Sequence, residues 1–209
     1  GVVNWIALMG WSFDDHTEFF TLPDLVEKFS IDHLNPSPAA INFTKLDHFN
    51  GLHIRNLSDE ELARRVAPYL EQAGFKPSLE KLEKIAPIIK ERLPTLDEVV
   101  EKAGFFFLED IDYSLDELTG KDLDSTQTRQ ILEKALVVFS DLPEFTKEYA
   151  EPPMREYVET SGLSAGQVFG VLRVAVTGQK VSPPLFESME IIGKDKVLER
   201  IRLAIEKLV

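Results

Sequence analysis

Apolar residues recur at helical spacing along almost the whole chain. Val197, Ile201, Ile205 and Leu208 give the last segment a single apolar stripe, because residues three and four positions apart share one helix face. No stretch alternates apolar and polar residues clearly enough to predict a sheet. The pattern therefore predicts an all-α protein with about ten helices and short loops.

Capping residues mark where the predicted helices begin and end. In a capping box, a hydroxyl accepts a backbone N–H and a Glu or Gln three residues later reaches back. Four segments fit this pattern, and they begin at Ser58, Thr95, Ser114 and Ser164. Thr21 is predicted to open another helix, and Ser182 to cap one that starts at Pro183. Glycines able to end helices follow apolar runs at Gly74, Gly120, Gly178 and Gly193.

Breaks in the helical pattern divide the chain into three segments. The first, roughly 1–55, ends near Asn50-Gly51. A helical unit over 56–113 follows, and a second unit runs over 114–209, with a break at Glu151-Pro152-Pro153 inside it. We expect two packed helical subdomains behind a shorter N-terminal segment.

The charge of the chain argues against indiscriminate binding of polyanions. The 209 residues carry 23 Lys and Arg against 36 Asp and Glu, a net charge of −13, whereas affinity for phosphates depends on basic side chains. The charge is uneven, since residues 154–209 hold 8 Lys and Arg against 7 Asp and Glu. Any nucleic-acid site is therefore expected to be local, in the last quarter and at isolated upstream arginines.

Composition also bounds the class of protein. No apolar run approaches the ~20 residues that a membrane helix needs, so we expect no membrane partner. The absence of cysteine excludes disulfides and thiolate metal sites, and it fits the cytoplasm. The chain begins with Gly rather than Met and has no secretory signal, which favours a fragment of a longer protein.

Catalytic motifs are absent or stand in the wrong surroundings. The sequence GLSAG at 162–166 matches the G-x-S-x-G nucleophile motif, but its flank is predicted to be helical and no histidine follows His53. The four histidines show no metal-ligand spacing, and no phosphate-binding loop is present. We expect no catalytic site, metal or ATP site in this chain, with Ser164 acting as a helix cap.

Four stretches carry a more specific signal. They are NWIALMGWS at 4–12, SPA at 37–39 with KLDHFNGLHI at 45–54, RLPTL at 92–96 with FFFLED at 105–110, and LRVAVTG at 172–178 with PLFE at 184–187 and LERI at 198–201. Together and in this order they resemble the C-terminal half of bacterial-type glutamyl-tRNA synthetases, which are class I aminoacyl-tRNA synthetases. The chain departs from that family at His48 and His53, where Trp and Tyr are usual.

The resemblance implies a fold, a function and a partner. Residues 1–55 would end a segment that contacts the tRNA stem, and 56–113 and 114–209 would form a helical-cage anticodon-binding region. The parent ligase would join glutamate to its tRNA in protein biosynthesis, with ATP and Mg²⁺ bound outside this chain. A glutamate-specific tRNA is the implied partner of a cytoplasmic monomer.

Arg173 is the first candidate contact. Gly166, Gly170, Arg173 and Thr177 share one face of a predicted helix, and two glycines beside an arginine leave a shallow strip that a flat base can approach. Alternatively, the glycines permit close helix packing and Arg173 meets an acid. The resemblance favours the first interpretation, since the family places an arginine here against the anticodon.

Arg92 closes a helix predicted from about Leu79. A basic residue complementing a helix C-terminus is the alternative, whereas the resemblance implies that Arg92 reads the third anticodon base and marks a discriminating enzyme. Ser182, Pro183 and Leu185 stand where the family lines its anticodon pocket, although an ordinary helix start explains Pro183 equally well.

Two other functions stay open at this point. A homologue that charges both glutamate and glutamine tRNAs would share the architecture, but Arg92 argues against it. An acidic helical protein-interaction module without RNA function would account for the net charge of −13.

Overall fold

The computed structural model describes residues 1–35, 41–120 and 122–208. These residues form twelve α-helices and three 3₁₀ helices. Within the described ranges there is no strand, only one isolated antiparallel bridge between Trp11 and Leu34. The all-α prediction is confirmed. The SPA motif at 37–39 lies outside the described residues.

The elements follow one another along the chain with short connections. The order is α1 (Val2–Leu8), α2 (Leu22–Lys28), η1 (Ile31–His33), α3 (Phe43–Arg55), α4 (Asp59–Gln72), α5 (Leu79–Ile89), η2 (Lys90–Arg92), α6 (Val99–Ala103), η3 (Gly104–Phe107), α7 (Leu115–Thr119), α8 (Ser125–Asp141), α9 (Lys147–Ser161), α10 (Ala165–Thr177), α11 (Leu185–Ile192) and α12 (Lys194–Lys207).

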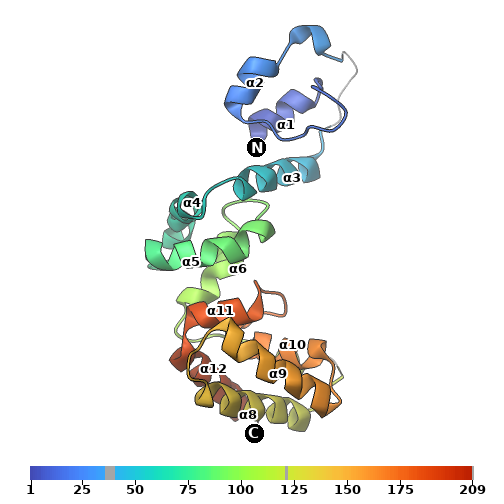
Figure 1. Ribbon diagram of the computed structural model, residues 1–209. Helices are drawn as coiled ribbons and strands as arrows, with labels where there is room; N and C mark the ends of the chain where they lie inside the picture. Colours follow the sequence, from blue (N-terminus) through green and yellow to red (C-terminus); the bar gives the residue numbers. More distant parts are fainter. Residues whose placement is uncertain (36–40, 121, 209) are drawn as a thin grey trace.

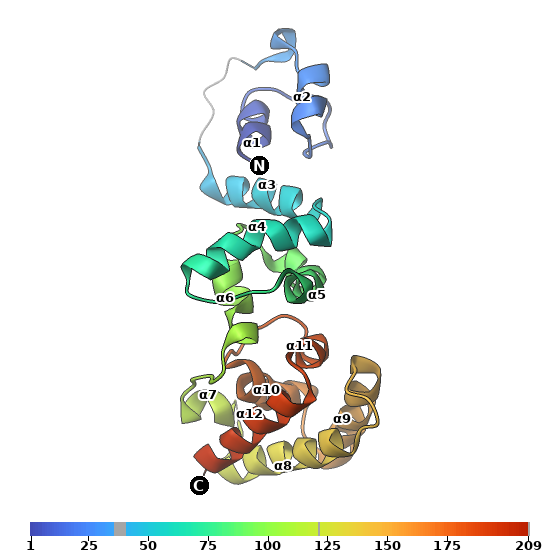
Figure 2. The ribbon, with the colours of Figure 1, turned by 90° about the vertical axis from the view of Figure 1, so that its left-hand side faces the viewer.

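The helices build an elongated molecule in three tiers (Figure 1). Helices α1 and α2 form the tier at the N-terminal end, α3 to α6 the middle, and α7 to α12 the tier that holds the C-terminus. A view turned by 90° shows the same order of tiers, with α3 lying across the boundary between the first and second (Figure 2). The middle and last tiers meet where α11 packs against α5 and η3, so side chains of the two tiers can act together near this boundary.

Each tier has its own apolar core. Trp11, Phe20 and Leu25 form the small core of the first tier. The middle core joins α4, α5 and α6 with η3, and the largest core packs α8, α10 and α12 around residues that are fully buried. The predicted boundaries at 55/56 and 113/114 remain a prediction. Two residues just before these boundaries pack with the segment that follows, since Ile54 belongs to the core of the middle tier and Tyr113 to the core of the last tier.

Most of the predicted helix ends are present, and their capping side chains accept hydrogen bonds from backbone N–H groups as predicted. Thr21, Ser114 and Ser164 form complete capping boxes, each accepting from the third helical N–H. Ser58 also caps α4 by accepting from the Glu61 N–H. Four predicted glycines have positive φ just past a helix, where a residue without a side chain costs least: Gly74, Gly120, Gly178 and Gly193.

Three local predictions were wrong. Thr95 begins no helix; the next one, α6, starts at Val99 after Glu98, and the preceding residues turn without a side-chain cap. Pro152 and Pro153 do not break the chain but lie inside α9. A proline φ near −65° is compatible with the helix, although each proline costs a backbone hydrogen bond and crowds the preceding turn. Helix α11 starts at Leu185 rather than Pro183.

The middle and last tiers are fastened to each other by polar and apolar contacts. Ile192 of α11 packs against both cores. Arg200 of α12, only 2% exposed, donates to the carbonyls of Val176, Phe105 and Leu108. Because these carbonyls belong to both tiers, Arg200 fixes their relative position from inside the interface.

Candidate nucleic-acid interface

Arg173 is held from one side by the loop that leads into α11. Its Nη1 donates to the Ser182 hydroxyl oxygen at 2.6 Å, to the Pro183 carbonyl at 2.9 Å and to the Ser182 carbonyl at 3.4 Å. Among the described residues, Nη2 and Nε of Arg173 have no hydrogen-bond partner. The guanidinium is therefore oriented by Nη1 and keeps its other donors for a ligand.

No described carboxylate pairs with Arg173, although the chain is strongly acidic. Burial lowers the pKa of its guanidinium, and the positive charge of Arg92 lowers this pKa further. A half-buried cation that is solvated only by neutral oxygens gains most from an incoming anion, because it has already lost water. The alternative in which Arg173 meets an acid is not what the structure has.

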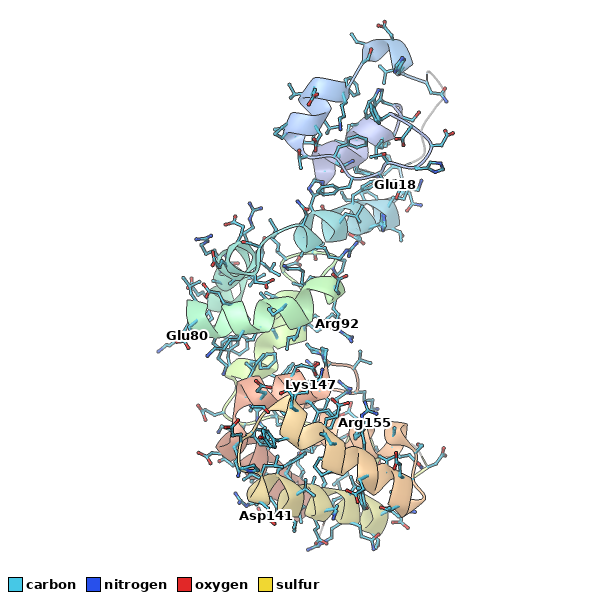
Figure 3. The ribbon with its side chains drawn as sticks, in the orientation of Figure 1. Glu18, Glu80, Arg92, Asp141, Lys147 and Arg155 are labelled. Carbon is cyan, nitrogen blue, oxygen red and sulfur yellow. The ribbon has the colours of Figure 1, made fainter. Side chains whose placement is uncertain are left out.

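Arg92 reaches the same region from the middle tier. It is exposed at the end of η2, directly before the buried Leu93, and makes no hydrogen bond or ion pair with any described residue. Figure 3 labels Arg92 on the side of α5 opposite to Glu80, near the boundary with the last tier. The positive charge of Arg92 contributes to the lowered pKa of Arg173, so the two guanidinium groups lie within electrostatic range of each other.

The spacing between these arginines is fixed by contacts across the tier boundary. The Gln179 side-chain amide, in the loop after α10, donates to the Glu101 carbonyl of α6 at 2.7 Å. Arg200 ties α10 and α12 to η3 deeper in the same boundary. Such ties limit movement between the tiers, so little order has to be gained when a ligand contacts both arginines.

The other predicted site residues lie behind this surface rather than on it. Thr177 is 2% exposed, and its hydroxyl donates to the Arg173 carbonyl at 2.8 Å. Ser182 and Pro183 are buried and supply the oxygens that hold Arg173. Leu185 belongs to the core of the last tier. These four residues orient Arg173 or support its loop, and their buried side chains form no exposed surface for a ligand.

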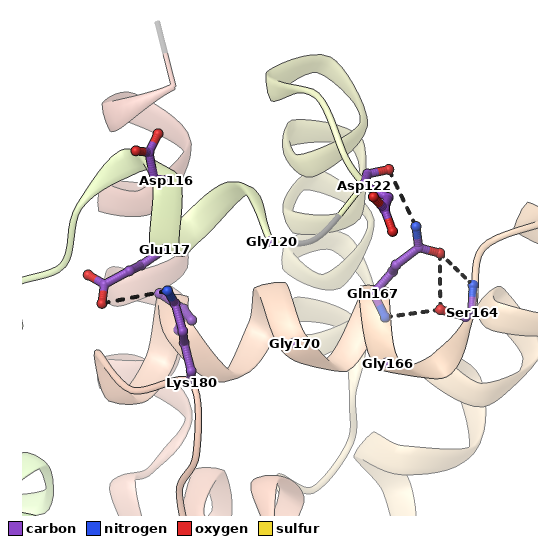
Figure 4. A pocket seen from close by; sticks show the side chains of 10 residues that line it. Asp116, Glu117, Gly120, Asp122, Ser164, Gly166, Gln167, Gly170 and Lys180 are labelled. Atoms are coloured by element: carbon purple, nitrogen blue, oxygen red, sulfur yellow. Dashed lines mark hydrogen bonds and ion pairs between the residues drawn. The ribbon is translucent and has the colours of Figure 1, made fainter.

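The glycine strip proves separate from Arg173. Gly166 and Gly170 line a groove of about 740 Å³ between α10 and α7, and its walls include Glu117 and Lys180 (Figure 4). A Cβ on Gly170 would meet no atom within 4 Å, so this glycine does not serve close helix packing. Arg173 is not among the residues that line the groove.

Two residues near Arg173 were missed at the level of sequence. Val181 is 77% exposed directly before Ser182, so the loop that holds Arg173 presents an apolar side chain to solvent. Gln179 bridges residues 78 positions apart in the chain, and nothing in a local pattern indicates such a partner. The apolar character of an exposed loop position is the only sequence signal that either residue offers.

In ranges 1–35, 41–120 and 122–208, no three His, Cys, Asp or Glu side chains gather as metal ligands would. None of the helices described is both long and apolar enough to cross a bilayer.

Comparisons with known proteins agree with this arrangement. The chain is 38% identical over 209 residues to a glutamate–tRNA ligase of Herpetosiphon aurantiacus, covering 97% of this chain and 42% of that protein. A glutamate–tRNA ligase of Roseiflexus castenholzii is 39% identical, with 98% and 42% covered. The chain thus spans less than half the length of these relatives, corresponding to their C-terminal anticodon-binding part.

Solved structures and family models give the same result. A crystal structure of a glutamate tRNA ligase from Elizabethkingia meningosepticum, in complex with its amino acid, superimposes with a TM-score of 0.86 at 27% identity; the match covers all of this chain and 41% of that one. The family model described as the anticodon binding domain matches residues 61–205, which include both Arg92 and Arg173. The chain belongs to this anticodon-binding-domain family.

Proposed function

We propose that this chain reads the anticodon of glutamate tRNA as the C-terminal part of a glutamate–tRNA ligase. The observation that carries the proposal is the pair of arginines at the tier boundary. Arg92 has no described partner, and Arg173 is half-buried, has donors to spare and donates only to neutral oxygens. Two cations without a paired carboxylate at one tier boundary, in a chain of net charge −13, are expected to serve an anionic ligand.

The geometry suits an unpaired RNA loop better than a duplex. Bases that are splayed out of a loop are bound by stacking and by hydrogen bonds to their edges, and arginine offers a planar set of donors for both. Arg92, exposed at the end of η2, reads the third anticodon base, and an arginine there selects glutamate tRNA over glutamine tRNA. Arg173 contacts a neighbouring base or phosphate of the same loop.

The buried members of the predicted site are positioning residues. Ser182 and Pro183 hold Nη1 of Arg173, Thr177 fixes the end of α10, and Leu185 anchors the start of α11 in the core. Val181, exposed beside them, supplies apolar area against a base or ribose. The site is thereby pre-formed, which reduces the ordering cost of binding.

The parent enzyme would attach glutamate to tRNA with ATP and Mg²⁺. The residues described here do not fit either group, because they include neither a phosphate-binding loop nor a cluster of metal ligands. We therefore place ATP, Mg²⁺ and the chemical step outside this chain. A cytoplasmic monomer with a single tRNA remains the expected form.

The decisive experiment measures tRNA binding by this chain, alone and as part of a full-length ligase, at two salt concentrations. Arg92→Ala and Arg173→Ala should each weaken binding by about 1–3 kcal/mol, roughly 5- to 150-fold. Arg129→Ala is the control, since Arg129 is exposed on α8 and already paired with Glu133 at 2.8 Å. Affinities of both variants equal to that of Arg129→Ala would refute the proposed interface.

A further inference from the structure

A second concentration of positive charge lies at the other end of α5. A pocket of about 480 Å³ opens between the loop before α5, η3 and α12. Four of its lining residues are cationic: Lys76, Lys81, Lys196 and Arg200. Glu80, next to Lys81 at the start of α5, is labelled in Figure 3 on the side opposite to Arg92. This pocket, called the α5 pocket below, is therefore separate from the arginine pair.

The charge of the α5 pocket is only partly balanced. Glu109 also lines it and pairs with Lys196 at 2.7 Å, and Glu199 pairs with the same lysine at 2.9 Å. Lys76 is exposed and makes no ion pair or hydrogen bond with the residues described. Two acids thus share one lysine, while the positive charges of the other three lining residues have no paired carboxylate.

Arg200 gives the strongest indication that the α5 pocket favours an anion. It is 2% exposed, its terminal nitrogens donate to three carbonyls, and its Nε has no partner within the described part of the chain. Burial lowers the pKa of its guanidinium, against the raising effect of Glu109, Glu199 and Asp110. A buried cation without a paired carboxylate is stabilised when an anion binds nearby.

Lys81 adds a second partly desolvated cation. Its Nζ donates to the Phe106 carbonyl at 2.6 Å and lies 5.2 Å from the centre of the Phe107 ring. Burial lowers the pKa of Lys81, and the charge of Arg200 lowers it further, whereas Glu109 raises it. Lys81 and Arg200 both line the α5 pocket, so an anion bound there would offset the repulsion between their positive charges.

The backbone at the start of α5 also favours an anion in this pocket. Ser78, another lining residue, caps the eleven-residue helix α5 and accepts from the Lys81 N–H. The N-terminal end of a helix carries partial positive charge and favours anions. Side-chain charge, a buried arginine and a helix end therefore converge on one pocket.

We propose that the α5 pocket binds a phosphate group, from either a phosphorylated small molecule or the RNA backbone. A phosphate presents oxygens in several directions, which suits donors that approach from α5, α12 and the preceding loop. The pocket is large enough for the group and part of whatever carries it. The α5 pocket is separate from the arginine pair. Binding of a phosphorylated small molecule there does not depend on the anticodon assignment, whereas binding of the RNA backbone rests on the proposed function.

Titrations of the 209-residue chain with inorganic phosphate and pyrophosphate, followed by calorimetry or NMR, test the proposal. Lys76→Gln should weaken phosphate binding several-fold without affecting stability, since Lys76 has no described partner. Lys81→Met should weaken it further. Lys84→Gln is the matched control, because Lys84 lies on the same helix but is paired with Glu80 at 2.9 Å.

Comparison with tRNA distinguishes the two sources of phosphate. If the site holds the RNA backbone, Lys76→Gln should reduce the dependence of log K on log salt by about 1, while free phosphate binds weakly or not at all. Specific binding of free phosphate with an unchanged salt dependence identifies a small ligand. Phosphate binding and tRNA salt dependence that are both the same in Lys76→Gln, Lys81→Met and wild type would overturn the proposal.

Discussion

The Nη1 of Arg173 donates to the Ser182 hydroxyl at 2.6 Å, and this contact orients a cation that no described acid neutralises. Ser182 is 5% exposed and also donates to the Pro183 carbonyl at 2.9 Å, so its hydroxyl is committed on both sides. A buried serine thus positions the guanidinium of a residue nine positions earlier in the chain. The proposed interface therefore depends on a buried side chain that positions the remaining donors of Arg173.

Ser182→Ala should separate positioning from contact. Loss of the hydroxyl removes one hydrogen bond to Arg173 but leaves that to the Pro183 carbonyl, so we expect a loss of about 1 kcal/mol in stability. The affinity for tRNA should fall, but by less than in Arg173→Ala. Denaturant unfolding and tRNA titration of the same samples measure the two effects.

Ser188→Ala is the control for this prediction. Ser188 is fully buried and its hydroxyl donates to the Pro184 carbonyl at 2.7 Å, so a similar loss of stability is expected. It does not contact Arg173, and tRNA affinity should stay at the wild-type value. Equal losses of affinity in the two variants would mean that the serine at 182 acts only through folding.

Gly170→Ala should stabilise the chain. Gly170 lies inside α10, where alanine is favoured over glycine by roughly 0.5–1 kcal/mol, and the added Cβ would meet nothing within 4 Å. The melting temperature should therefore rise by about 1–4 °C. A fall instead would restore the interpretation that this glycine permits close helix packing.

Gly178→Ala provides the opposite case on the same helix. Gly178 has φ +72°, and a Cβ there would lie 3.2 Å from the Asp112 carbonyl oxygen. Alanine should destabilise the chain by about 1 kcal/mol or more, since both the backbone conformation and the space are unfavourable. Thermal melts of the two variants side by side check the pair of predictions.

Local sequence rules predicted what depends on neighbours in the chain. The caps at Thr21, Ser114 and Ser164 involve residues three positions apart, so the sequence alone identifies them. The same rules failed at Thr95 and at Pro183, where the motif is present but no helix follows directly. At Pro183 the reason is tertiary, because Ser182 binds Arg173 instead of a helical N–H.

In the candidate site, too, the sequence identified individual residues but not the tertiary contacts around them. Arg92 and Arg173 are candidates from helix position and family resemblance, and their role in binding the anticodon stays a prediction. Their surroundings were not predictable, since Gln179 and Arg200 reach partners 78 and 95 positions away. Periodicity placed Thr177 on the face of Arg173, but it could not show that the hydroxyl is buried against the Arg173 carbonyl.

His53 should make the first tier sensitive to acid. Its Nε2 lies 3.2 Å from Asn4 Oδ1, and burial lowers its pKa below the usual 6.5, with a further contribution from the charged amino terminus. The unfolded chain then takes up a proton near pH 6.5 while the folded chain does not. Stability from this group is complete above pH 6.5 and declines as the pH falls below it.

His53→Gln isolates this contribution from the many carboxylates of the chain. Denaturant midpoints measured from about pH 8 to about pH 5 should fall less steeply below pH 6.5 in the variant than in wild type. His48→Gln is the control, because His48 is half-exposed and lies 3.3 Å from Glu18. Parallel curves for wild type and His53→Gln would show that His53 has an unperturbed proton affinity.

Arg92→Gln in a full-length ligase carrying this chain should change which tRNA is charged. The substitution removes a charged, planar donor from an unpaired base edge, at a cost of about 1–3 kcal/mol in discrimination at that base. Charging of glutamate tRNA should fall, while mischarging of glutamine tRNA rises relative to it. The folded structure should be unaffected, since Arg92 is exposed and has no described partner.

The measurement is the ratio of kcat/KM for the two tRNAs. Arg64→Gln serves as the matched control, because Arg64 is exposed on α4 in the same tier and pairs with Glu61 at 3.4 Å. ATP binding in the absence of tRNA should be equal in all three proteins, which shows that the substitution acts through recognition. If the ratio for Arg92→Gln equals that of wild type and Arg64→Gln, then Arg92 only complements the end of its helix, and selection of glutamate tRNA must reside elsewhere.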